Sequence, residues 1–172
     1  MISIRQHAEI GVSIALAIVL GTLTRFIQMP FGGSINLSLL PIVVLALRRG
    51  PWIGGIAGGL FGVVDFVLNP FFYHPLQVVL DYPLAFACMG GFSGLAVGKT
   101  RWIMASFIAG AGCMRLLLHW LSGILFFASY APVGTSVWWY ALTYNSAYVV
   151  PETVLCIVLS QLGMRVIRGG NE

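Results

Sequence analysis

The sequence predicts an all-α polytopic membrane protein in which six transmembrane helices form a single domain over residues 1–172. Hydrophobic residues make up 59% of the chain and charged residues only 8%, whereas soluble domains carry roughly 25% charged residues. The mean hydropathy is +0.94, and apolar runs recur along the chain between polar or proline-rich breaks. A soluble fold of this length could not bury so much apolar surface, so membrane lipid is the predicted surrounding.

The apolar runs define the six predicted helices. They cover residues 7–26, 36–49, 52–69, 76–98, 102–128 and 139–167. The run at 36–49 is short for a full crossing, and Pro41 is expected to bend or interrupt it. The N-terminal stretch MISIRQHAEI leads into the first run without a small-residue cleavage site, so no cleavable signal peptide is expected.

Lysine and arginine residues are distributed unevenly between the two ends of these helices. On one side lie Arg5, Arg48, Arg49, Lys99, Arg101, Arg165 and Arg168. The loops 70–75 and 129–138 on the opposite side contain neither residue type, and Arg25 alone breaks the pattern. The positive-inside rule therefore places both termini in the cytoplasm. Because the basic residues are scattered at helix ends rather than clustered, they indicate topology and not nucleic-acid binding.

Small residues recur every four positions on three predicted helices. The three sets are Gly54, Gly58 and Gly62; Gly90, Gly94 and Gly98; and Ser13, Ala17 and Gly21. Such spacing lets helices approach closely in lipid. For the two glycine sets we expect packing within the chain. The set on the first helix could equally contact a separate membrane subunit.

Signatures of catalysis and of metal or cofactor binding are missing from the sequence. It contains no GxxxxGK[ST] phosphate loop, no HExxH motif and no GxSxG motif beside a usable triad. Cys88, Cys113 and Cys156 lie in apolar runs without metal-ligand spacing, so we interpret them as packing residues. We therefore expect no cofactor and no metal. Asp81 and His119 could form an intramembrane acid–base pair, but no nucleophile is evidently placed beside them.

Polar residues from three predicted helices reach a similar depth. Because a helix rises about 1.5 Å per residue, Asp81 lies about one to two turns below the outer surface and His119 about 25 Å above the inner end of its helix. Asn145 enters from outside at a similar level. Polar groups are costly inside a membrane, so this concentration indicates a binding site in the outer half.

The last predicted helix presents a polar face. Asn145, Tyr148 and Glu152 are spaced so that they share one side of a helix. Tyr140 lies five residues before Asn145, too far round a regular helix to share that side. If Tyr140 and Asn145 both touch one ligand, Tyr140 is expected to belong to a non-helical lead-in.

Three acids, Asp65, Asp81 and Glu152, lie inside the predicted spans against one clearly internal base, Arg115. Arg115 and Glu152 both come out near mid-membrane, so we predict that they pair, with Asp65 as a competing partner. An uncompensated charge there costs at least about 2.5 kcal/mol. One acid then remains available for an incoming cation or stays protonated, and Asp81 is the candidate counter-ion.

These groups suit a small, flat organic cation. Aromatic faces can come from Tyr73, Phe127, Trp138 or Trp139, and Tyr140, and a desolvated cation–π contact is worth about 2 kcal/mol. Asp81 supplies the opposite charge, while His119 and Asn145 can hydrogen-bond ring nitrogens or an amino group. The two tryptophans also fit an aromatic belt at the membrane interface.

Three segments carry a resemblance to a known family. FFYHPLQVVLDYPLAF (71–86), HWLSGILFFASYAP (119–132) and WYALTYNSAYVVPE (139–152) resemble the thiamine-specific substrate-binding (S) component of energy-coupling factor (ECF) transporters, the YuaJ-type thiamine transporters. The motifs cover about a quarter of the chain, and the helix layout is similar over essentially all of it. Two departures are visible: some members have glutamate at the position of Asp81, and the loop PFGGSINLSLLP lacks a tryptophan and a glutamate that some members place there.

The resemblance implies a function and a set of partners. The chain would be a non-enzymatic subunit in the plasma membrane of a prokaryote that captures thiamine from outside. It would bind a transmembrane coupling protein through Ser13, Ala17 and Gly21, and two cytoplasmic ATPases would power release inward. The implied ligand contacts are Tyr73, Asp81, His119, Tyr140 and Asn145, with Phe127 where the family often has a stacking tryptophan.

Three alternatives stay open at this point. The first keeps the same architecture but changes the vitamin, for example to a thiamine precursor or riboflavin. The second is an intramembrane enzyme that uses Asp81 and His119. The third is a solitary carrier or channel.

Overall fold

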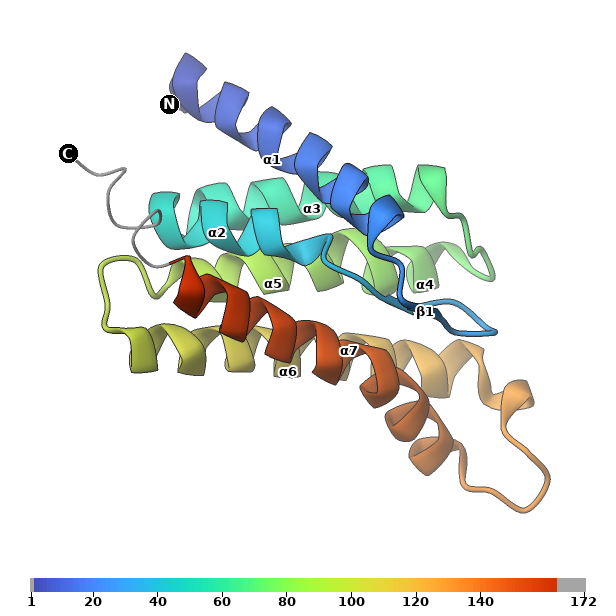
Figure 1. Ribbon diagram of the computed structural model, residues 1–172. Coiled ribbons are helices and arrows are strands. Elements are labelled where there is room, and N and C mark those ends of the chain that lie inside the picture. Colours follow the sequence, from blue (N-terminus) through green and yellow to red (C-terminus); the bar gives the residue numbers. More distant parts are fainter. Residues whose placement is uncertain (1, 164–172) are drawn as a thin grey trace.

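A computed structural model describes residues 2–163 as a helical bundle with one short hairpin (Figure 1). The helices are α1 (Ile4–Leu23), α2 (Leu39–Arg49), α3 (Pro51–Leu68), α4 (Pro75–Val79), α5 (Ala85–Gly94), α6 (Arg101–Phe126) and α7 (Val137–Leu162). A π-helical turn, η1 (Leu80–Leu84), joins α4 to α5, and a 3-10 turn, η2 (Ala128–Tyr130), follows α6. Strands β1 (Ile27–Gln28) and β2 (Ser34–Ile35) pair antiparallel.

The predicted layout of six helical segments is confirmed. α1, α3, α6, α7 and the continuous segment Pro75–Gly94 are long and apolar enough to cross a membrane. α2 has 11 residues and rises only about 16 Å, as its short apolar run predicted. The start of α1 and the end of α7 lie at the same end of the bundle (Figure 1). The predicted end of the last helix at residue 167, with Arg165 and Arg168, lies outside the described residues.

The expectation about Pro41 needs correction. Pro41 does not interrupt α2, because the helix begins at Leu39 and runs unbroken to Arg49. Pro41 therefore sits in the first turn, where its missing N–H costs no helical hydrogen bond. Within the predicted helix 76–98, Pro83 lies in the π-helical turn η1, which also carries Asp81. Proline cannot donate to the regular helical ladder, and π-turns occur where such a bond is missing.

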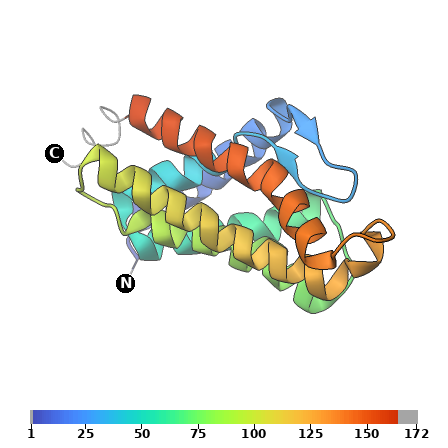
Figure 2. The same ribbon diagram turned by 90° about the horizontal axis from the view of Figure 1, so that it is seen from below.

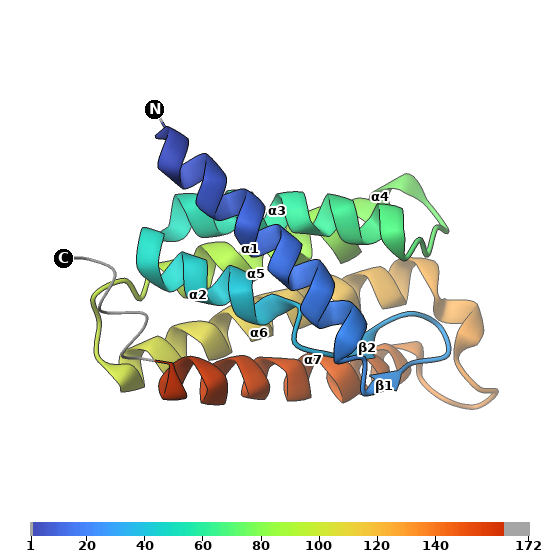
Figure 3. The same cartoon turned by 45° about the horizontal axis from the view of Figure 1, so that its top comes forward.

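The hairpin was not predicted, because the stretch between the first two helices was interpreted as a loop. Gly32 and Gly33 at its tip have φ of +92° and +85°, a left-handed region that favours glycine. The paired glycines in PFGGS were the available signal. The hairpin lies over the outer half of α7 (Figures 2 and 3).

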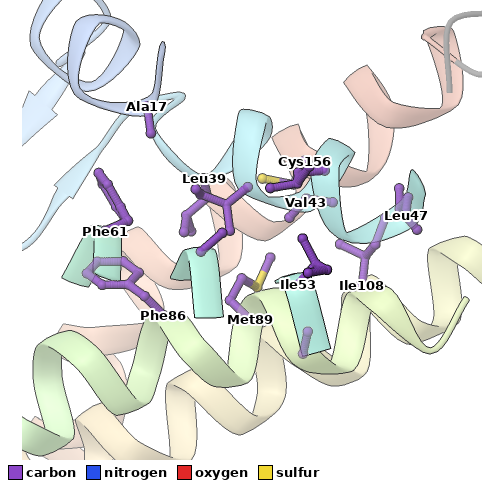
Figure 4. Packing of buried hydrophobic residues seen from close by; sticks show 14 of the residues in the cluster. Ala17, Leu39, Val43, Leu47, Ile53, Phe61, Phe86, Met89, Ile108 and Cys156 are labelled. Atoms are coloured by element: carbon purple, nitrogen blue, oxygen red, sulfur yellow. The ribbon is translucent and has the colours of Figure 1, made fainter. Parts of the chain in front are cut away.

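Glycine lets α3 and α5 pack with their backbones in contact. A Cβ on Gly58 would overlap the main-chain carbonyl oxygen of Phe86. The predicted internal packing is confirmed for Gly54, Gly58, Gly62, Gly90 and Gly94. Gly98 is different: it has φ of +70° and no neighbour within 4 Å of a Cβ, so it serves the turn after α5. Apolar side chains from α1, α2, α3, α5, α6 and α7 form the core (Figure 4).

Gly58→Ala is expected to lower the free energy of unfolding by about 2–3 kcal/mol, because the overlap is with rigid backbone and the helices must separate. Gly59→Ala is the matched control, since its Cβ would meet Ala87 Cβ at 3.6 Å and Pro83 O at 3.7 Å, which is ordinary contact. Thermal unfolding in detergent measures both. Equal loss in the two variants would contradict the backbone-contact explanation.

The small-residue set on α1 faces the chain's own bundle. α1 crosses over α2 and α3 (Figure 3). Ala17 is fully buried, and a Cβ on Gly21 would lie 3.1 Å from Ser38 Cβ. Ala17 and Gly21 therefore pack within the chain, whereas Ser13 is half-buried, and docking of a coupling protein through this set stays a prediction.

Candidate functional site

A cavity of about 640 Å³ lies toward the hairpin end of the bundle, between α1, the hairpin, α3, η1, α6 and α7. Five of the seven predicted ligand-binding residues line it: Asp81, His119, Phe127, Tyr140 and Asn145. Pockets of this size hold vitamin-sized molecules. The fold thus brings Asp81 of η1, His119 of α6 and Asn145 of α7 to one cavity, in agreement with the similar membrane depths predicted for them.

The other two predicted residues lie outside the cavity lining. Tyr73 is 55% exposed, and its ring packs on Phe126 and Phe127. Trp138 is 57% exposed, and its carbonyl oxygen accepts the Trp120 indole N–H at 2.9 Å. Tyr73 therefore packs against Phe127, a residue of the cavity wall. Trp138 lies at the surface, as a residue of an interfacial aromatic belt would.

Asp81 is the centre of a polar network on the inner wall of the cavity. Its Oδ2 accepts from Gln77 Nε2 at 2.8 Å and from Ser122 Oγ at 2.9 Å. Its Oδ1 lies 3.0 Å from His119 Nδ1. Gln77 and Ser122 are almost completely buried, and Gln77 Oε1 also accepts the Tyr73 backbone N–H. The carboxylate is thus fixed in place, with acceptor capacity remaining on Oδ1.

His119 lines the cavity and has one buried ring nitrogen without a hydrogen-bond partner among the described residues. Its side chain is buried, and Nε2 has no hydrogen-bond partner among the described residues. The edge of the ring packs against Tyr148, with centroids 5.8 Å apart. When Nδ1 donates to Asp81, Nε2 carries the lone pair and can accept an N–H from a ligand.

Arg115 and Glu152 form the predicted buried ion pair. Arg115 Nη1 lies 2.6 Å from Glu152 Oε2, and both side chains are at most 5% exposed. The guanidinium also lies over the rings of Phe86 and Tyr148, at 5.1 and 5.9 Å from their centroids. Glu152 Oε1 accepts the Asn36 backbone N–H at 3.2 Å. The competing partner Asp65 does not take part in this pair.

The Asn145 amide is used mostly within the protein. Its Nδ2 donates to the backbone oxygens of His119 and Ala141 at 3.3 and 2.8 Å. Its Oδ1 accepts the Tyr148 hydroxyl at 2.7 Å. Asn145 therefore links α7 to α6 beside His119, and only Oδ1 retains capacity for a ligand.

Tyr140 lines the cavity from within α7 rather than from a non-helical lead-in. Tyr140 and Asn145 differ by about 140° around a helix, and the residues between these two directions, such as Tyr144 and Tyr148, also line the cavity. The cavity borders this whole arc of α7. The expectation of a non-helical segment is wrong because it assumed a narrow contact face.

Tyr144 was missed by the sequence analysis and holds the hairpin over the cavity. Its hydroxyl accepts the Phe31 backbone N–H at 2.8 Å and donates to Gly32 O at 3.1 Å. A Cβ on Gly33 would lie 2.6 Å from the Tyr148 ring, so the hairpin tip approaches α7 at a place where only glycine fits.

Tyr144→Phe is expected to raise the amide hydrogen-exchange rate of Phe31 by about tenfold, because two hydrogen bonds of about 0.5–1.5 kcal/mol each are lost. Tyr130→Phe is the control. Its ring also packs on Phe31, with centroids 4.6 Å apart, but the hairpin hydrogen bonds to Tyr144 remain. Both variants keep their rings, so similar acceleration would mean that loss of any nearby tyrosine hydroxyl loosens the hairpin and that the Tyr144 hydrogen bonds have no special role.

A second polar group lies at the outer side of the cavity. Arg25 Nη2 donates to Asn69 Oδ1 at 2.9 Å, and Asn69 Nδ2 donates to Asp65 Oδ1 at 3.0 Å. All three residues line the cavity, and we call them the Arg25–Asn69–Asp65 row. The sequence analysis did not assign Arg25 to the site, although its exceptional position on the outer side was the signal.

The charges around the cavity leave one acid uncompensated. The charged lining residues are Arg25, Arg115, Asp65, Asp81 and Glu152, which sum to −1 with His119 neutral. Arg115 is paired with Glu152, and Arg25 is linked to Asp65 through Asn69. Asp81 has polar neighbours but no Lys or Arg ion-pair partner among the described residues. The arrangement is therefore complementary to a monocation placed near Asp81.

Comparisons with known proteins agree with this geometry. A family model described as "Thiamine transporter protein (Thia_YuaJ)" matches residues 7–167. A Bacillus subtilis protein named "Thiamine transporter ThiT" is 38% identical over 165 residues, covering 88% of this chain and 85% of the relative. A Lacticaseibacillus paracasei protein of the same name is 32% identical over 176 residues, covering 90% and 87%. A solved structure of ThiT from Listeria monocytogenes superposes with a TM-score of 0.80 at 26% identity and covers 92% of both chains.

Proposed function

Because the chain belongs to the thiamine transporter protein family Thia_YuaJ, we propose that it is the thiamine-binding membrane subunit, or S component, of an ECF-type importer. The observation that carries the proposal is the uncompensated Asp81 in a cavity whose lining has a net formal charge of −1. Thiamine is a monocation, since its thiazolium ring carries a permanent positive charge. The Asp81 carboxylate is the counter-ion in this proposal.

Aromatic side chains supply the remaining contacts that such a ligand needs. Phe127, Tyr140 and Tyr144 line the cavity with Phe31 and Phe71 from the outer loops. Phe127 stacks loosely with Phe71, with centroids 5.7 Å apart, so it is held as a wall even though phenylalanine replaces the larger tryptophan. A cation enclosed by such rings gains about 2 kcal/mol from each desolvated cation–π contact.

The aminopyrimidine ring of thiamine fits the free nitrogen of His119. Its amino group can donate to His119 Nε2, the buried acceptor that lacks a partner among the described residues. The family is a transport family, so the Asp81–His119 contact serves binding and not catalysis.

Calorimetric titration of the purified protein with thiamine tests the proposal. We expect one binding site with a dissociation constant below micromolar. Riboflavin and the isolated aminopyrimidine precursor are the comparison ligands, and both should bind much more weakly. Absence of saturable thiamine binding, or tighter binding of riboflavin, would overturn the assignment.

The proposal includes partners and orientation. The chain would lie in the plasma membrane with both termini cytoplasmic and would deliver thiamine with a membrane coupling protein and two ATPases. The absence of a phosphate-loop motif from the sequence and the basic residues at the inner helix ends support this arrangement. Uptake of labelled thiamine should require the ATPases when the chain is expressed in cells. Full uptake without them would indicate a solitary carrier.

A further inference from the structure

We propose that the Arg25–Asn69–Asp65 row binds the hydroxyethyl arm of thiamine, and that Asp65 makes the site select the free alcohol over its phosphate ester. This inference rests on the proposed function, because it places the charged ring beside Asp81. It assigns a task to Arg25, the one basic residue that the topology puts on the outer side.

The row lies within reach of a ligand held at Asp81. Tyr82 follows Asp81 in η1, and its hydroxyl donates to the Asn69 backbone oxygen at 3.1 Å. Tyr82 and the row line the same cavity. Tyr82 thus ties the η1 turn that carries Asp81 to the loop at Asn69, and Asp81 and the row line one cavity. The hydroxyethyl arm extends from the thiazolium ring itself, so a ring beside Asp81 can direct this arm to the row.

The free hydrogen-bonding groups of the row match an alcohol. The Arg25 guanidinium has five N–H donors, and its described side-chain contacts are Asn69 Oδ1 and Gln28 Oε1. Asp65 accepts from Asn69 through Oδ1, and its Oδ2 takes part in no hydrogen bond among the described residues. A hydroxyl group both donates and accepts, so it can bond Asp65 and Arg25 together.

A phosphate ester does not match the same row. It brings about 1.5 to 2 negative charges at neutral pH. The positive charge of Arg25 is already balanced by Asp65 through Asn69, and the remaining cation of the lining, Arg115, is paired with Glu152. A phosphate in the row would therefore meet the Asp65 carboxylate with no spare cation to compensate it.

Titrations of thiamine and thiamine monophosphate against the full chain and single variants test this inference. We expect the wild type to prefer thiamine. Asp65→Asn should reduce that preference by about fivefold, mainly through tighter binding of the ester, because a nearby like charge is removed. Asp65→Glu keeps the charge and should keep most of the preference. Arg25→Gln should act in the opposite direction and weaken the ester further.

The outcomes separate this inference from the proposed function. If the wild type binds neither ligand, the proposed function fails. If it binds thiamine but Asp65→Asn changes both affinities by the same factor, the function stands and the role of Asp65 is overturned. Should Asp65→Asn fail to fold, Arg25→Gln decides: an unchanged ratio of the two affinities overturns the inference, and a larger preference for thiamine supports it.

Discussion

Glu152→Leu is expected to lower the free energy of unfolding by about 3–5 kcal/mol, the usual cost of leaving one partner of a buried ion pair uncompensated. Arg115 Nη1 lies 2.6 Å from Glu152 Oε2, and neither side chain is more than 5% exposed. Without the carboxylate, Arg115 keeps its charge in an apolar bundle, and Asn36 loses the acceptor of its backbone N–H. Thermal and denaturant unfolding in detergent measure the loss.

The double variant Arg115→Met/Glu152→Leu is the control for this prediction. It removes both charges and replaces them with apolar side chains of similar length, so most of the stability should return. A double variant as unstable as Glu152→Leu would mean that packing or the Asn36 contact, and not the unpaired charge, causes the loss.

Asp81→Asn is expected to weaken thiamine binding by about 100-fold, because a hydrogen-bonded charge contact in a partly buried site is worth about 1.5–3 kcal/mol. The change is nearly isosteric, but it removes the charge that faces the cation and replaces one acceptor oxygen of the network with a donor. Isothermal titration calorimetry gives the affinity, and the circular dichroism spectrum checks that the bundle is intact.

The Asp81→Asn prediction has two controls, a neutral ligand analogue and a second variant at the same position. A neutral analogue, in which a thiophene replaces the thiazolium ring, should lose much less affinity in Asp81→Asn than thiamine does. Asp81→Glu, which keeps the charge and matches the residue in some family members, should retain most of the binding. Equal losses for the cation and the neutral analogue would refute the counter-ion role and leave Asp81 as a residue that positions His119.

Much of the fold and part of the site could be predicted from the sequence. Helix positions follow from apolar runs, and depth follows from the constant rise of a helix. Those two inferences together placed Asp81 beside His119 and Arg115 beside Glu152, which the structure confirms at 3.0 and 2.6 Å. These contacts were predictable because charges inside a membrane have very few ways to be compensated.

The features that were missed depend on tertiary contacts with no local pattern. The hairpin is held by the Tyr144 hydroxyl, more than a hundred residues away in the chain. The π-helical turn at Asp81 lies inside a segment whose apolar pattern predicts a regular helix. Asn145, predicted as a ligand contact from its depth, its residue type and the family resemblance, stays a prediction, and its Nδ2 also donates to His119 O and Ala141 O, which the sequence did not indicate.

The hairpin across the cavity has a kinetic consequence. A vitamin that enters from that side must wait until the contacts at Tyr144 and Gly33 open, so the association rate should level off at high vitamin concentration. The same contacts reform over the occupant and slow its escape. When thiamine is scarce, a long residence time of the bound vitamin benefits the cell more than a fast association rate. The hairpin, which is part of the chain itself, would provide that long residence time.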